Sequence, residues 1–198
     1  MARPRADASA APTQDRLLQA GEAAFAVRGF ADTRLEDVAK ECGITRPSLL
    51  YHFATKEELY AAVVHRAFER LATALLAAMS IGGSFVERVD AVSHGFLAFV
   101  RGNPHFAPLL LRELLDGRGP GRQLILDAVT PVIDALERFL VEDGGEVVRP
   151  GLPARAAILQ LAMGTLVRAA SGPLEKPLWG EGEDLPTMAR IVFLREAP

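Results

Sequence analysis

Residues Leu35–Ala54, LEDVAKECGITRPSLLYHFA, decide the fold of this chain. Good helix formers and apolar residues at spacings of three and four stand on both sides of Gly43. A glycine there supplies the positive φ that a tight turn between two short helices requires. The pattern predicts a helix-turn-helix whose second helix can enter a DNA major groove about 12 Å wide. A plain helical hairpin inside a core has the same spacing, so spacing alone leaves that alternative open.

Outward from this motif the chain is predicted to be all-α, because strictly alternating β-branched runs are missing. The expected helices are 13–28, 34–42, 46–53, 56–79, 85–101, 104–115, 122–141, 154–170 and 185–196. Thr33 with Glu36 and Thr55 with Glu58 are predicted capping boxes, and Asn103 a predicted N-cap. Pro131 is expected to kink or split its helix. Residues 117–121, 144–153 and 171–186 are expected to be loops or irregular.

Composition excludes several classes of protein. With 49% hydrophobic and 24% charged residues over 198 positions, the chain can bury a core and is not disordered. No apolar run approaches the roughly 20 residues of a membrane span, and residues 1–11 have no secretory apolar segment. A single cysteine, Cys42, predicts a reducing, cytoplasmic setting and a small buried side chain rather than a redox sensor.

Charge is distributed unevenly along the chain. The net charge is −3, yet residues 1–56 hold eight basic and seven acidic residues. Within Thr45–Lys56 stand Arg46, His52 and Lys56 and no acidic residue. Positive charge is therefore local to the second helix of the motif, which favours a DNA-binding surface there over a whole-surface nucleic-acid binder.

Thr13–Val64 resembles the DNA-binding domain of the tetracycline-repressor (TetR/AcrR) family of bacterial transcription regulators. The matching positions, in order, are Phe25, Gly29, Phe30, Thr33, Val38, Ala39, Gly43, Ile44, Thr45, Leu49, His52, Phe53, Lys56, Glu57 and Leu59. One position departs from the family pattern, because Leu50 stands where the family usually has a tyrosine and Tyr51 follows it. The resemblance implies a DNA-binding domain over residues 1–56 and a helical sensor and dimerisation domain over residues 57–198.

The same resemblance implies roles that the residue chemistry supports. Thr33 and Thr45 begin helices, where free N–H groups suit a phosphate, and Lys56 can neutralise another phosphate. Arg46 at the front of the second helix can pair with guanine. The predicted DNA-binding residues are Thr33, Arg34, Thr45, Arg46, Pro47, Ser48, Tyr51, His52 and Lys56. For Tyr51, packing is the alternative, and the threonines can serve as caps alone.

The C-terminal helices are expected to form a ligand pocket and a homodimer interface. The predicted pocket residues are Phe68, Leu71, Leu75, Phe96, Phe99, Phe106, Leu110 and Glu113, with Glu113 as the polar group. The predicted dimer residues are Ile158, Leu161, Ala162, Thr165, Ala169, Met188 and Val192. For each pocket residue, a place in a solid core is the alternative.

These observations predict a regulator that binds a near-palindromic operator in double-stranded DNA and is released by a small apolar or amphipathic molecule. Enzyme motifs such as Walker A, G-x-S-x-G, H-E-x-x-H and C-x-x-C are missing, so we expect no catalysis, no cofactor, no metal and no membrane partner. The alternative function is a helical protein-interaction scaffold, or a small-molecule-binding protein that does not bind DNA.

Overall fold

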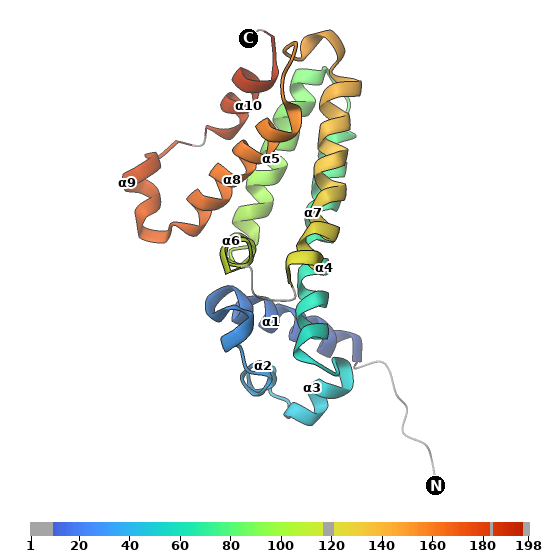
Figure 1. Cartoon of the computed structure of the whole chain (residues 1–198), viewed down its shortest axis with the longest axis vertical. Coiled ribbons are helices and arrows are strands. Elements are labelled where there is room, and N and C mark those ends of the chain that lie inside the picture. Colours follow the sequence, from blue (N-terminus) through green and yellow to red (C-terminus); the bar gives the residue numbers. More distant parts are fainter. Residues whose placement is uncertain (1–9, 117–120, 183, 196–198) are drawn as a thin grey trace.

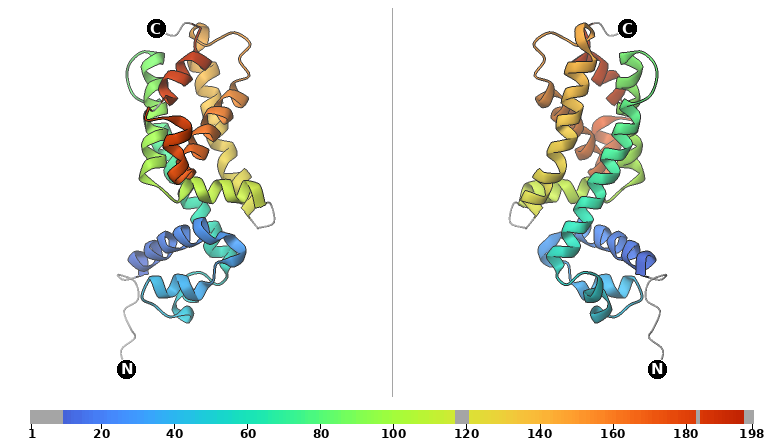
Figure 2. Two further views of the ribbon diagram at one scale, coloured as in Figure 1. Left: turned by 90° about the vertical axis from the view of Figure 1, so that its left-hand side faces the viewer. Right: turned by 90° about the vertical axis from the view of Figure 1, so that its right-hand side faces the viewer.

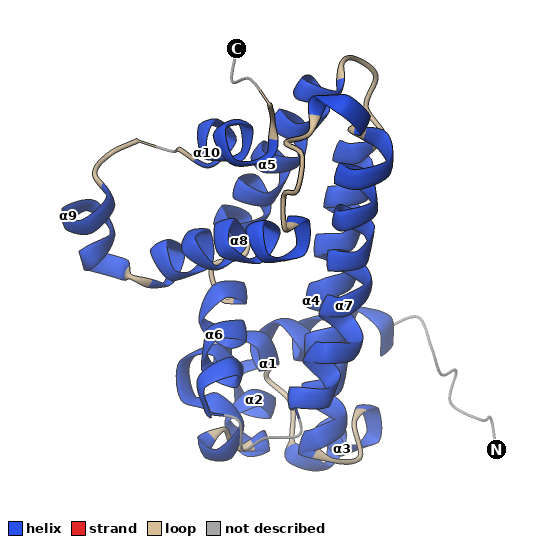
Figure 3. Cartoon of the chain, turned by 45° about the horizontal axis from the view of Figure 1, so that its top comes forward, coloured by secondary structure: helices blue, strands red, loops and turns tan. Residues whose placement is uncertain are grey.

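A computed structural model describes residues 10–116, 121–182 and 184–195 of the chain. These residues form ten α-helices and no strand, which confirms the all-α prediction (Figure 3). The helices are α1 (Ala10–Asp32), α2 (Leu35–Glu41), α3 (Arg46–His52), α4 (Lys56–Met79), α5 (Phe85–Gly102), α6 (Phe106–Asp116), α7 (Gly121–Arg138), α8 (Ala154–Ala170), α9 (Glu175–Trp179) and α10 (Leu185–Phe193).

Most helix ends follow local rules that the sequence displays. α4 and α8 have the predicted bounds, and Thr55 caps α4 by accepting a hydrogen bond from the Glu58 amide at 3.1 Å. In the predicted capping box the Glu58 carboxylate would accept a hydrogen bond from the Thr55 amide. It accepts one from the Ala54 amide instead, one residue earlier in the chain. Gly29, at φ 78°, interrupts α1 close to its predicted end.

Three local predictions were wrong, and the predicted seventh helix is not split at Pro131. Thr33 caps nothing, because its hydroxyl donates back to the Gly29 carbonyl of α1 at 2.7 Å and α2 has no side-chain cap. Asn103 ends α5 by donating to the Phe99 carbonyl, and α6 begins only at Phe106. α7 continues through Pro131 and passes at Phe139–Asp143 into a π turn. Residues 172–179 are a 3₁₀ turn followed by α9, although three prolines predicted irregular chain.

The predicted loop at 117–121 falls largely on residues 117–120, which lie outside the described residues. The predicted C-terminal helix ends at Phe193, and its expected last residue, Glu196, also lies outside them.

α4 is the rod that joins the two ends of the molecule (Figure 1). Its first half packs against α1, next to α2 and α3, and its second half runs between α5 and α7. α6 lies across the junction, against α1 on one side and α8 on the other (Figure 2). One cluster of buried apolar residues extends from Leu17 through Leu59 to Leu110, so packing is continuous across residue 56.

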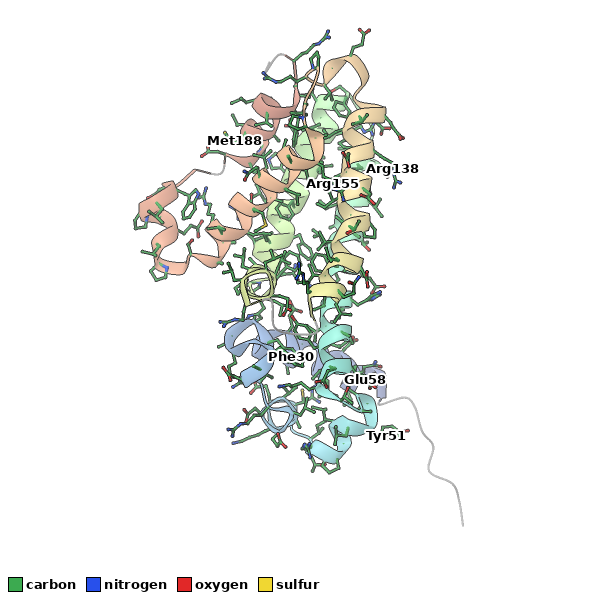
Figure 4. All side chains as sticks on the ribbon, in the orientation of Figure 1. Phe30, Tyr51, Glu58, Arg138, Arg155 and Met188 are labelled. Carbon is green, nitrogen blue, oxygen red and sulfur yellow. The ribbon has the colours of Figure 1, made fainter. Side chains whose placement is uncertain are left out.

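Ion pairs fasten the outer helices to this frame. Arg155 of α8 lies between α8 and α7 and bonds Asp134 at 2.6 Å and Glu137 at 2.9 Å (Figure 4). Arg190 of α10 makes a two-pronged contact with Asp90 of α5. These pairs are partly exposed, so water screens them and they mainly set the orientation of the helices.

Candidate nucleic-acid interface and apolar cavity

The helix-turn-helix is held rigidly against α1. Val38, Ala39 and Leu49 are almost fully buried between the three helices, and Cys42 in the turn is buried with them. Gly43 takes φ 68°, and the Arg16 side chain of α1 donates to the Cys42 carbonyl at 2.5 Å. Burial raises the pKa of the Cys42 thiol, which keeps it in the unreactive protonated form.

The first turn of α3 leaves its polar groups accessible to solvent. Thr45 has extended backbone and caps the helix, accepting a hydrogen bond from the Ser48 amide at 3.4 Å. Pro47 occupies the first turn, where a helix does not use the missing N–H. Leu49 and Phe53 face inward, and Leu50 is half-buried against the same core. The opposite face of α3 is thereby turned to solvent.

The predicted DNA-binding residues divide into three groups by exposure. Arg34, Thr45, Arg46, Pro47 and Tyr51 are exposed, and Ser48, His52 and Lys56 are half-buried. Tyr51 is 83% exposed and projects from the far end of the molecule, stacked edge-on against His52 (Figure 4). Thr33 is 2% exposed and its hydroxyl is engaged with α1, so we exclude its side chain from the contact surface.

Arg46 is held in place by an acidic neighbour. Its guanidinium lies 2.8 Å from the Glu36 carboxylate of α2, and both side chains remain more than half exposed. Sequence reasoning did not anticipate this pair, although Glu36 stands in the first turn of the neighbouring helix. The contact leaves other guanidinium N–H groups available for a base edge.

Lys56 has a structural role that its charge alone did not reveal. Its ammonium donates to the Ala31 carbonyl at 3.1 Å and the Thr33 carbonyl at 3.2 Å. The ammonium nitrogen also lies 4.5 Å from the centre of the Phe30 ring, so Lys56 links the C-terminal end of α1 to the start of α4. One N–H of the ammonium remains for a phosphate.

We expect Lys56→Ala to weaken binding to operator and random DNA by the same factor, because a phosphate contact carries no sequence information. The slope of log affinity against log salt should fall by about 0.9 for each lost phosphate contact. Lys176→Ala is the matched control, since Lys176 of α9 pairs with Glu181 far from α3. A selective loss for operator DNA, with an unchanged salt slope, would contradict this role.

An apolar cavity of about 260 Å³ lies inside the C-terminal bundle. α4, α5, α6, α7, α8 and α10 all contribute to its wall. Of the predicted pocket residues, the wall contains Phe68, Leu71, Leu75, Phe96, Phe106 and Leu110. The sequence placed the ligand among helices that include α7 but named no α7 residue, although Ile125, Val129, Val132 and Leu136 repeat there at helical spacing.

Phe99 and Glu113 do not belong to the described cavity wall. Phe99 is buried and packs edge-on against Phe106, on the core side of the cavity lining. Glu113 is 7% exposed and one of its oxygens accepts a hydrogen bond from the Tyr60 hydroxyl at 2.6 Å. Its other oxygen, Oε1, has no hydrogen-bond partner among the described residues. Glu113 therefore lies at the junction of α4 and α6 rather than inside the pocket.

The predicted dimer residues also divide. Ile158, Leu161 and Ala162 of α8 face the cavity, so the apolar stripe predicted as an interface is largely internal. The outer surface of α8 and α10 instead exposes Val167, Met188 and Ile191. Figure 4 labels Met188 on α10. Thr165 and Ala169 line a second, polar cleft with Arg168, and Val192 is half-buried against the α10 core.

Two further findings come from the described residues. None of their helices combines the length and the apolar character needed to cross a bilayer. No three His, Cys, Asp or Glu side chains among them are grouped as metal ligands.

These features define a helix-turn-helix protein whose described residues are helical and surround an apolar cavity. Residues 17–63 match the sequence profile described as bacterial regulatory proteins, tetR family. The matched segment, which holds the helix-turn-helix, therefore has the sequence pattern of this family. Residues 1–16 and 64–198 lie outside the profile match.

Known proteins resemble part of this chain in sequence and nearly all of it in fold. The transcriptional activator FasR of Mycolicibacterium smegmatis is 29% identical over 85 residues, which cover 43% of this chain and 39% of FasR. In the first relatives, the matched segments span 34 to 58% of their own length.

Two solved structures resemble nearly the whole chain. SmeT, the repressor of the Stenotrophomonas maltophilia multidrug efflux pump SmeDEF, has a TM-score of 0.67 and 22% identity, covering 92% of this chain and 91% of SmeT. AibR in complex with isovaleryl coenzyme A and operator DNA has a TM-score of 0.67 and 20% identity, covering 91% and 98%. At these identities the likeness shows the fold.

Proposed function

We propose that this protein is a ligand-responsive transcriptional repressor that binds operator DNA as a homodimer and acts in the cytoplasm by binding rather than catalysis. The observation that carries the proposal is one rod, α4, joining two sites. It begins at Lys56 beside the exposed face of α3 and reaches the cavity at Phe68, roughly 18 Å further at 1.5 Å per residue. The matched family profile and AibR, solved with both operator DNA and a small molecule, support the same assignment.

The DNA contacts of the proposal follow from exposure and chemistry. Arg46 and Ser48 read base edges, and Pro47 contacts a thymine methyl group. Tyr51, His52, Thr45 and Lys56 contact phosphates, and Arg34 adds positive charge. Tyr51 supplies the hydroxyl that half-buried Leu50 cannot. Residues 1–56 form the DNA-binding unit of this proposal, and residues 57–198 the sensor and dimerisation unit.

The proposed dimer uses the outer face of α8 and α10. These two helices pack against each other, so exposed Val167, Met188 and Ile191 lie on neighbouring helices of one side of the bundle. Exposed Gly164 on α8 allows close approach of a symmetry-related helix. Burying such side chains against their copies removes apolar surface from water, which favours association.

Footprinting on the DNA upstream of the protein's own gene is the test. We expect protection of a near-palindrome with half-site centres about 34–36 Å apart, because two symmetry-related α3 helices must enter successive major grooves. Sedimentation should show a dimer alone and on DNA. Inverting one half-site is the matched control and should abolish protection of both. A monomer at micromolar concentration, with or without DNA, would refute the proposal.

A further inference from the structure

The cavity wall is free of charge among the described residues. Its side chains are aliphatic, aromatic or thioether, except for Ser93 of α5 and Thr130 of α7. The one buried carboxylate nearby, Glu113, is outside the wall and already engaged by Tyr60. An ionised group placed inside would lose its hydration with no counter-charge, which costs several kcal/mol or more.

The opening of the cavity is apolar as well. The wall residues Leu114, Leu126 and Leu159 are 52%, 51% and 39% exposed, which places the mouth between α6, α7 and α8. A charged head group extending through the mouth would therefore meet leucine side chains. Neither the interior nor the mouth offers the ion partner that an acidic or basic amphiphile needs.

Size sets a second limit. A 150 Å³ cavity lined by Leu, Ile and Phe in another protein holds benzene, so about 260 Å³ accommodates roughly ten non-hydrogen atoms. Naphthalene has this size.

The wall contains two polar side chains, and one of them has a hydrogen-bond donor available to a ligand. The Ser93 hydroxyl donates to the Val89 carbonyl of its own helix at 2.9 Å, so its donor is used. Thr130 makes no hydrogen bond through its hydroxyl to another described residue, and it is an exposed residue of the wall. Its donor is available to one ligand oxygen.

We infer that the cavity binds an uncharged, hydrocarbon-like molecule of about ten non-hydrogen atoms, with at most one neutral polar group, which bonds Thr130. This inference deepens the proposed function and rests on it only for the role of the cavity as effector site. Binding is measured on the full chain without DNA, so a failure of DNA binding leaves this test intact.

The test uses naphthalene, 1-naphthol and 1-naphthoate at pH 7, titrated by calorimetry. We expect naphthalene and 1-naphthol to bind and 1-naphthoate to bind at least about a hundredfold more weakly than 1-naphthol, because only the carboxylate is charged. Equal affinity for 1-naphthoate would overturn the inference and would mean that the head group stays outside. Failure of both neutral probes to bind would overturn it as well.

Two substitutions locate the site. Thr130→Val keeps the side-chain shape and should weaken 1-naphthol by about fivefold while leaving naphthalene within about twofold. Thr73→Val makes the same change on the exposed face of α4 and should alter neither. Ala162→Phe fills the cavity and should abolish naphthalene binding, whereas Ala156→Phe on the outer face of α8 should not. Unchanged probe affinities in Thr130→Val and Ala162→Phe would place the ligand elsewhere.

Discussion

We expect Tyr60→Phe to lower the free energy of unfolding by about 2–3 kcal/mol, because among the described residues Tyr60 is the one hydrogen-bond donor to the buried carboxylate of Glu113. Tyr60 is 1% exposed, and its ring packs edge-on against Phe25 and Phe30 of the DNA-binding end. Gly121, the first residue of α7, presses on the same carboxylate, because a Cβ there would lie 2.3 Å from Glu113 Cδ. Chemical denaturation at pH 7 measures the change.

The chain supplies a matched control for this variant. Tyr51 is its other tyrosine, and Tyr51→Phe removes the same atom from an exposed side chain. We expect its stability to change by less than about 0.5 kcal/mol, with weaker DNA binding instead. In a Glu113→Gln background, Tyr60→Phe should cost less than in wild type, because the lost acceptor is then neutral. Equal costs in both backgrounds would contradict the pairing.

The Tyr60 contact also has a pH signature. Burial, followed by the Glu113 hydrogen bond and charge, raises the pKa of Tyr60 above its usual value of 10.0. Below pH 10 the Tyr60 hydroxyl is protonated in both the folded and the unfolded chain, and its full contribution to the free energy of unfolding is present. Above it the unfolded chain releases the proton that the folded chain keeps, so the stability advantage over Tyr60→Phe should shrink by about 1.4 kcal/mol per pH unit. If the stability advantage of wild type over Tyr60→Phe grew at alkaline pH, the raised pKa of Tyr60 would be wrong.

Arg46→Ala is expected to cost about 1–3 kcal/mol of operator binding, a loss of roughly 5- to 150-fold, and to relax preference at one base position. The reason is geometric, since Arg46 is exposed in the first turn of α3 and Glu36 fixes its direction. Binding to random DNA should fall much less. Affinities for the operator and for its single-base variants provide the measurement.

Arg28→Ala is the matched control for Arg46. Arg28 of α1 also faces a carboxylate of α2, Asp37 at 3.9 Å, but it lies outside α3. We expect it to affect operator and random DNA alike. If Arg46→Ala also reduces both equally, its role in reading bases is wrong. Glu36→Gln should strengthen binding to all DNA by a few fold, because it removes a negative charge near the phosphates.

The sequence alone determined the helices whose signals are local. α3, α4 and α8 have their predicted positions because a capping threonine, a proline in the first turn or an uninterrupted apolar repeat acts within one or two turns of chain. The same signals predicted the helix-turn-helix, with Gly43 at positive φ and Cys42 buried.

Only the tertiary structure decided which partner each side chain meets. Thr33 looks like a cap in sequence, but α1 offers its hydroxyl a closer carbonyl. Ile158 looks like an interface residue, but α8 crosses the bundle with that face inward. Glu113 shares a helical face with Leu110, yet Tyr60, 53 residues away in the chain, engages its carboxylate outside the cavity. Helical periodicity reports that a face is apolar, whereas the crossing of distant helices determines whether that face lines a core, a cavity or a partner.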